Sequence, residues 1–93
     1  MGLRFEWDSK KARANITKHG VTFEEATTVF GDPLSLTIAD PLHSTTEKRF
    51  ITMGMTRDDN LLVIVHTARH SAIRIISARE ATPRERRNYE KAS

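Results

Sequence analysis

The sequence contains no cysteine, which excludes disulfides, thiolate zinc sites and a cysteine nucleophile. It also lacks a long hydrophobic run, because the longest unbroken apolar stretch, Leu61–Val65, is far too short to cross a bilayer. Residues 1–11 carry charges of both signs and do not resemble a secretory signal. Internal repeats, low-complexity stretches and long linkers are missing as well. We therefore expect one soluble, cytoplasmic domain over residues 1–93.

Arginine is what the chain has in excess, and it is unevenly placed. The net charge is +3; residues 1–46 hold five Lys/Arg against six Asp/Glu, and residues 47–93 hold ten against six. All but two of those ten are arginines, whose guanidinium offers a rigid fork of donors that matches phosphate oxygens. This bias favours an anionic partner such as nucleic acid. The alternative is an exposed basic face that only aids solubility.

Two short helices are predicted in the first third of the chain. Asp8 is placed to cap a helix over residues 9–19, and Gly20 follows where a left-handed C-terminal residue is favoured. Thr22 opens a capping box and starts a second helix over residues 23–30. Both helices are too short to be stable alone, so they need a sheet to pack on.

The remaining chain predicts that sheet and a third helix. Alternating or continuous apolar and β-branched residues indicate strands, and His70-Ser71 allows a tight connection between the last two. Thr82 opens another capping box, which starts a helix over residues 83–91. The order β-α-α-β-β-β-β-α predicts an α+β fold in which the last four strands form an antiparallel meander. The strands are expected at residues 3–7, 34–38, 48–55, 61–67 and 73–78.

The last hairpin sets how the late arginines are distributed. With a two-residue loop, Val65 lies opposite Ile76. This register places Arg69 and Arg74 on one face of the sheet and Arg79 at the edge of the other, mostly aliphatic face. A slip of one residue would regroup the two faces.

Short catalytic motifs are missing from the sequence. It has no phosphate-binding P-loop, no H-E-x-x-H helix and no G-x-S-x-G elbow. No two histidines have the i, i+4 spacing of a metal site on a predicted helix; His66 and His70 are four apart but lie in a predicted strand and its turn, where that spacing does not bring them together. We therefore expect exposed or hydrogen-bonded histidines, with no metal and no cofactor. They are His19, His43, His66 and His70.

The polar residues suit metal-independent cleavage of RNA. That reaction needs a base for the 2′-hydroxyl, cations for the charged phosphorane and an acid for the leaving 5′-oxygen. Each candidate also has a structural alternative: a cation at a helix C-terminus, a surface ion pair, or a tyrosine that anchors the last helix. Tyrosine would need its pKa lowered by nearby cations to act as a base. The acid and base candidates are His19, His43, Glu47 and Tyr89, and the cations are Lys18, Arg49, Arg69, Arg74 and Arg79.

Blocks of residues along nearly the whole chain resemble the BrnT family, the toxin half of bacterial type II toxin–antitoxin pairs. No single block would suffice, but their order and spacing are specific. The blocks are Phe5-Glu6-Trp7-Asp8 with Lys10 and Asn15, Lys18-His19-Gly20-Val21, Phe23-Glu24-Glu25-Ala26 with Val29-Phe30 and Asp32-Pro33, Asp40 with His43-Ser44, Glu47 and Arg49, and Arg74-Ile75-Ile76-Ser77-Ala78-Arg79 with Thr82, Arg84-Glu85-Arg86 and Tyr89.

The resemblance implies a RelE-like fold and an endoribonuclease that blocks translation, similar to an mRNA interferase. It implies neutralisation by a BrnA-like ribbon-helix-helix antitoxin, with operator DNA bound only through the antitoxin complex and no membrane partner. The residues that match the family and could act on RNA are Lys18, His19, Glu47, Arg49, Arg69, Arg79 and Tyr89.

Two other functions are compatible with the residues alone. A non-enzymatic basic module, or an inactive toxin homologue that acts through its antitoxin, would also lack a clear nucleophile or base dyad. Direct DNA binding by this chain is less favoured, because the arginine-rich residues 83–91 are not preceded by helix-turn-helix spacing.

Overall fold

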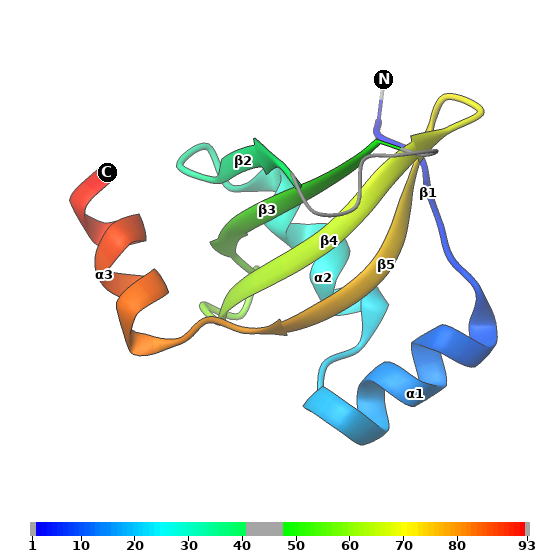
Figure 1. Cartoon of the computed structure of the whole chain (residues 1–93), viewed down its shortest axis with the longest axis horizontal. Coiled ribbons are helices and arrows are strands. Elements are labelled where there is room, and N and C mark those ends of the chain that lie inside the picture. The colour runs from blue at the N-terminus through cyan, green and yellow to red at the C-terminus, as the bar shows by residue number, and fades with distance from the viewer. Residues whose placement is uncertain (1, 41–47, 93) are drawn as a thin grey trace.

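The computed structural model describes residues 2–40 and 48–92 of the chain. Over these residues the predicted element order is confirmed, with the second helix ending in a 3-10 turn, η1 (Figure 1). The elements are β1 (Phe5–Glu6), α1 (Ser9–His19), α2 (Phe23–Thr27), η1 (Thr28–Gly31), β2 (Leu36–Ala39), β3 (Arg49–Met55), β4 (Leu61–Arg69), β5 (Ala72–Glu80) and α3 (Pro83–Ala92).

The strands form one sheet in the order β1-β5-β4-β3-β2. β2 to β5 make the antiparallel meander that the sequence predicts. The short β1 pairs in parallel with β5, which makes the sheet mixed and brings the N-terminal strand beside the last one. This edge pairing was not anticipated, since the chain leaves β1 through two helices and returns to it only with its final strand.

One face of the sheet is covered by α1, α2 and η1. The caps that the sequence predicts are formed: the Asp8 carboxylate accepts a hydrogen bond from the Lys10 amide at 2.8 Å, and Gly20 ends α1 with φ 70°. Thr22 Oγ1 accepts from the Glu25 amide at 3.0 Å and opens α2. These helices bury a core against the central strands, which supplies the stability that they lack alone. Its buried members are Val21, Phe23, Ala26, Val29, Leu62, Ile64, Ile75 and Ala78.

A β-bulge in the last hairpin corrects the predicted register. The loop at His70 and Ser71 is as expected, with φ of 51° and 66°, and Thr67 lies opposite Arg74. Further along, however, Val65 pairs with Ser77 and not with Ile76. The extra residue shifts every later side chain of β5 to the other face. Ala78 therefore joins the helix-covered core, and Arg79 moves to the face that carries Arg69 and Arg74.

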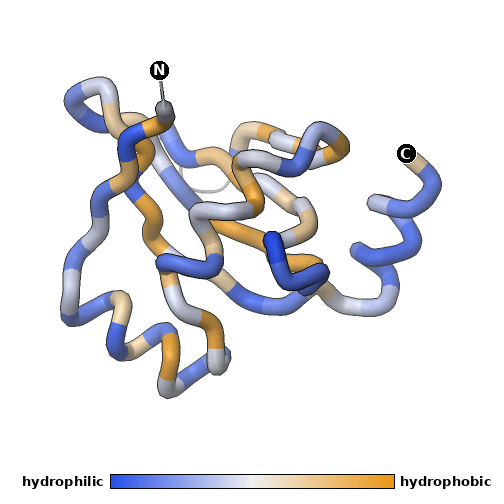
Figure 2. The backbone as a smooth tube through the Cα atoms, turned by 180° about the vertical axis from the view of Figure 1, so that it is seen from behind, coloured by the Kyte–Doolittle hydropathy of each residue, from blue (hydrophilic) through white to orange (hydrophobic). Residues whose placement is uncertain are grey.

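The opposite face of the sheet is partly uncovered. α3 lies away from α1 and α2, beside the end of the sheet formed by β2 and β3, and is hydrophilic along most of its length (Figures 1 and 2). β2 forms at Leu36–Ala39, close to the predicted strand at residues 34–38, and its apolar residues Leu36 and Ile38 are exposed. None of the described helices is long and apolar enough to cross a membrane.

Candidate functional site

We call the face of the sheet opposite α1 and α2 the open face. The arginines that the sequence singles out lie at its two ends. By register, Arg49 of β3 lies beside Thr67 of β4, which lies beside Arg74 of β5. Arg69 ends β4 on the same face. We name Arg49, Arg69 and Arg74 the basic surface.

The basic surface is held by its neighbours in the sheet. Thr67 is buried, and its hydroxyl donates to the carbonyl oxygen of Lys48 at 2.5 Å, which fixes the start of β3. Arg74 donates to Glu6 Oε2 of β1 at 2.8 Å, a pair that is about one third exposed. This partner was missed from sequence, because only the parallel pairing of β1 with β5 brings the two residues together.

Two arginines of the basic surface have no such partner. Arg49 is half-buried and Arg69 is exposed, and neither makes an ion pair within residues 2–40 and 48–92. An unpaired guanidinium keeps its full fork of donors for an incoming anion. The basic surface therefore presents positive charge with donor capacity to spare.

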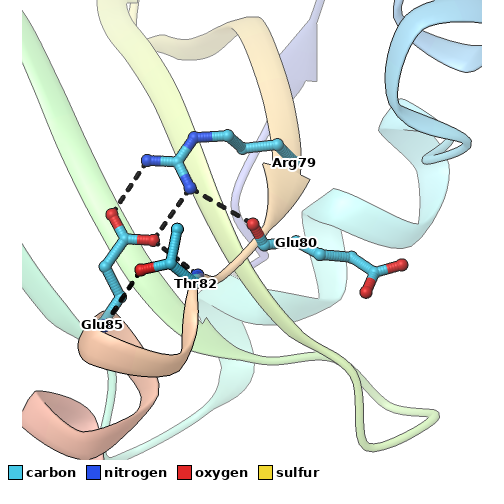
Figure 3. Close-up of polar contacts among 4 residues, drawn as sticks. All are labelled: Arg79, Glu80, Thr82 and Glu85. Atoms are coloured by element: carbon cyan, nitrogen blue, oxygen red, sulfur yellow. Dashed lines mark hydrogen bonds and ion pairs between the residues drawn. The ribbon is translucent and has the colours of Figure 1, made fainter.

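Arg79 is differently placed, at the α3 end of the open face. Its Nη1 and Nη2 atoms donate to the two carboxylate oxygens of Glu85, each at 2.8 Å, and Nη1 also contacts the Glu80 carbonyl oxygen at 3.2 Å (Figure 3). Glu85 accepts from the Thr82 amide in the predicted capping box. The hydrogen bonds from Arg79 lower the pKa of Glu85 to about 2, and those to Glu85 raise the pKa of Arg79. Arg79 thus fastens the start of α3 to β5.

Tyr89 is the second fastening of α3. It is buried, and its hydroxyl donates to Asp32 Oδ2 at 2.6 Å. The same oxygen accepts from the Met55 amide. The hydrogen bond to Asp32 raises the pKa of Tyr89 to about 12. This shift is opposite to the one that a tyrosine base requires, and the geometry fits the anchoring alternative.

The other sequence-predicted residues lie apart from the basic surface or outside the described residues. Lys18 and His19 are in the last turn of α1, within the helix layer that covers the opposite face. Lys18 is exposed and His19 is half-buried. Glu47 and His43 fall outside the described residues. The structure therefore brings together Arg49 and Arg69, with Arg74, and leaves the remaining candidates elsewhere.

His66 is a buried histidine on the helix-covered face. Its Nε2 atom lies 2.7 Å from Thr52 Oγ1, which lies 2.7 Å from Thr37 Oγ1, and its ring packs against Phe30 and Phe50. Burial lowers the pKa of His66 to about 4, so the ring is neutral at pH 7. Its place is in the core. No group of three metal-ligating side chains occurs in the described part of the chain.

A shallow hollow over η1 is less suited to binding an anion than the basic surface is. It has a volume of about 590 Å³ and is lined by residues of β1, α2, η1 and the β3–β4 turn. Its lining contains one cation, Arg57, beside the carboxylates of Asp32 and Asp59. The net negative lining repels phosphate, which leaves the basic surface as the anion site that the described residues support.

A solved bacterial ribonuclease toxin has a similar fold. The crystal structure of the Brucella abortus ribonuclease toxin, BrnT, is similar with a TM-score of 0.64, over 87% of this chain and 99% of that one, at 21% sequence identity. No curated protein matches the sequence.

The family assignment comes from a match between the sequence and a family model. The family described as "Ribonuclease toxin, BrnT, of type II toxin-antitoxin system" matches residues 7–85. This match spans most of the chain, from the end of β1 into α3. The chain belongs to the BrnT family of type II ribonuclease toxins.

Proposed function

We propose that this chain is a metal-independent endoribonuclease that cuts RNA on its basic surface and so blocks translation, as an mRNA interferase does. The observation that supports this most directly is the convergence of Arg49, Arg69 and Arg74 at one end of the open face. Guanidinium groups bind the phosphate diester and stabilise the extra negative charge of its transition state. Arg49 and Arg69, which make no ion pair within residues 2–40 and 48–92, can supply the donors that this requires.

The reaction divides into bond changes that the residues can serve. The 2′-oxygen attacks the neighbouring phosphorus while its proton passes to a base, the bond from phosphorus to the 5′-oxygen breaks, and that oxygen takes up a proton. The products are a 2′,3′-cyclic phosphate and a 5′-hydroxyl. His43 and Glu47, two of the four acid and base candidates, shortly precede Arg49 in the sequence, so we propose that the base and the acid come from this pair. We assign no catalytic role to the other four candidates. Lys18 and His19 lie in the helix layer on the opposite face, and Arg79 and Tyr89 each bind a carboxylate.

The proposal includes a partner. We infer a BrnA-like ribbon-helix-helix antitoxin that neutralises the toxin, with operator DNA bound through the antitoxin and not by this chain. The type II family supports a protein antitoxin in general.

The test is cleavage of single-stranded RNA by the purified chain in excess EDTA. We expect fragments with 2′,3′-cyclic phosphate and 5′-hydroxyl ends. We expect Arg49→Ala to slow cleavage about 30-fold, which corresponds to about 2 kcal/mol and lies within the range for hydrogen bonds to a charged group. Arg57→Ala, which removes an exposed arginine of the β3–β4 turn, should cleave like the wild type. Activity that EDTA abolishes and Mg²⁺ restores, or RNA left intact by the folded chain with and without ribosomes, would contradict the proposal.

A further inference from the structure

An apolar groove lies on the open face between the sheet and α3. It has a volume of about 270 Å³, and none of its lining residues belongs to the basic surface. Side chains of β2, β3 and β4 form its floor, and α3 forms its wall. The lining residues are Leu36, Ile38, Ile51, Met53, Val63, Glu85 and Asn88.

The groove is open to water at the edge of the sheet. Leu36 is 36% exposed and Ile38 is 61% exposed, both on β2. The outer edge of β2 pairs with no other strand among residues 2–40 and 48–92. Exposed apolar side chains beside an unpaired edge leave apolar area whose burial by a partner would be favourable. The floor has no donors for phosphate, so the groove is not an extension of the RNA site.

Cations lie at two margins of the groove, and the one carboxylate in its lining, Glu85, is paired with Arg79. Arg49 precedes the floor residue Ile51 by two positions on β3, so both side chains are on the open face. On α3, Arg84 and Lys91 are four and three residues from the wall residue Asn88, which makes them its neighbours on the helix surface. A ligand for this groove therefore has an apolar side and negative charge at its margins.

We propose that this groove binds a segment of the antitoxin, an amphipathic stretch whose apolar residues cover Leu36, Ile38 and Ile51 and whose carboxylates pair with Arg49 and Arg84. The inference rests on the antitoxin named in the proposed function, but not on RNA cleavage. It also accounts for neutralisation: an antitoxin carboxylate that is paired with Arg49 prevents this arginine of the basic surface from binding RNA. A second copy of this chain fits less well, since a symmetric pair would bring the cationic margins of both grooves together.

The test measures binding of the antitoxin encoded in the same operon, labelled for fluorescence anisotropy. We expect Ile38→Asp to raise Kd at least 100-fold, because it places a charge on the apolar floor. Leu34→Asp is the matched control: Leu34 is 50% exposed but does not line the groove, so its Kd should stay within about threefold of the wild type. Arg84→Glu should raise Kd about tenfold, and Arg57→Glu should not.

Several results would overturn this assignment. One is wild-type Kd for Ile38→Asp; another is no binding of the antitoxin to the wild-type chain. A third is a dimer of the chain alone, seen by sedimentation velocity, that Ile38→Asp dissociates while antitoxin binding is unchanged. If Ile38→Asp fails to fold, Ile38→Ser serves in its place. RNA cleavage by the same variants separates the two proposals, because Ile38→Asp should retain wild-type cleavage.

Discussion

The two ends of the open face carry arginines in opposite states. At the hairpin end, Arg74 makes one contact with Glu6, and Arg49 and Arg69 have no ion-pair partner within the described residues. At the α3 end, Arg79 makes two contacts with Glu85, whose carboxylate also caps α3. An arginine keeps more donors for an anionic ligand where fewer of them are already bound to a carboxylate. The count of arginines alone does not distinguish these roles.

Removing both Arg49 and Arg69 should slow RNA cleavage more than any other change proposed for the open face. The double variant Arg49→Ala with Arg69→Ala should cut RNA at least 100-fold more slowly, since it removes donors for the transition-state charge. The salt dependence of RNA binding should also become shallower by about two phosphate contacts.

A matched pair of substitutions at the other end controls for net charge. Arg84→Ala with Arg87→Ala removes two exposed arginines of α3. If this variant cleaves RNA as slowly as the Arg49/Arg69 double variant, then net charge and not the position of the arginines determines the rate. The two ends of the open face would then not differ in function. Thermal unfolding of both variants checks that the fold is intact.

A smaller effect is expected from breaking the Arg79–Glu85 pair. Glu85→Gln should lower the free energy of unfolding by about 1–2 kcal/mol, a figure reduced for solvent screening because the two side chains are 30–40% exposed. The pKa of Glu85 falls from 4.5 to about 2 on folding. The stabilisation is therefore complete above pH 4.5 and is lost as the pH falls toward 2.

The measurement is urea unfolding from pH 7 to pH 2.5. The wild type should lose stability across the acid range, and Glu85→Gln should lose less. Glu80→Gln, a neighbouring exposed glutamate, provides the control. An identical acid profile for wild type and Glu85→Gln would show that this pair does not hold α3.

The smallest effect sharpens the contrast at the hairpin end. Glu6→Gln releases Arg74 from its carboxylate, so RNA should bind about threefold more tightly, in line with the modest worth of a partly exposed ion pair. Glu24→Gln makes the same charge change on α2 and should leave affinity unchanged. RNA affinity is measured by the fluorescence anisotropy of a labelled RNA that cannot be cleaved. Equal gains in affinity for both variants would show that net charge, and not the release of Arg74, is the cause.

Much of the fold could be predicted because its signals are local. Asp8, Thr22 and Thr82 mark helix starts by the hydrogen bonds that their own side chains accept. The bulge opposite Val65 could not be predicted, since an extra residue leaves the apolar pattern of β5 almost unchanged. It alone decides that Arg79 shares a face with Arg74.

The candidate site was predictable as a set of residue types and not as an arrangement. Arg49 and Arg69 were expected and do lie together, because strand register follows from the hairpin loop. Tyr89 and Arg79 were expected in the same site, but each is held by a carboxylate distant in the sequence or on another element. These contacts form only because α3 packs back against the sheet, and the sequence does not indicate where it packs.

By itself, the sequence determined the elements and their order, because capping and periodicity act over a few residues. It also determined the BrnT family and the supply of arginines, because both can be read from the order of the residues along the chain. The tertiary structure decided which arginines are paired with a carboxylate, which face the arginines share and that β2 leaves its apolar side chains exposed. Those properties depend on contacts between residues far apart in the chain, which no local pattern encodes.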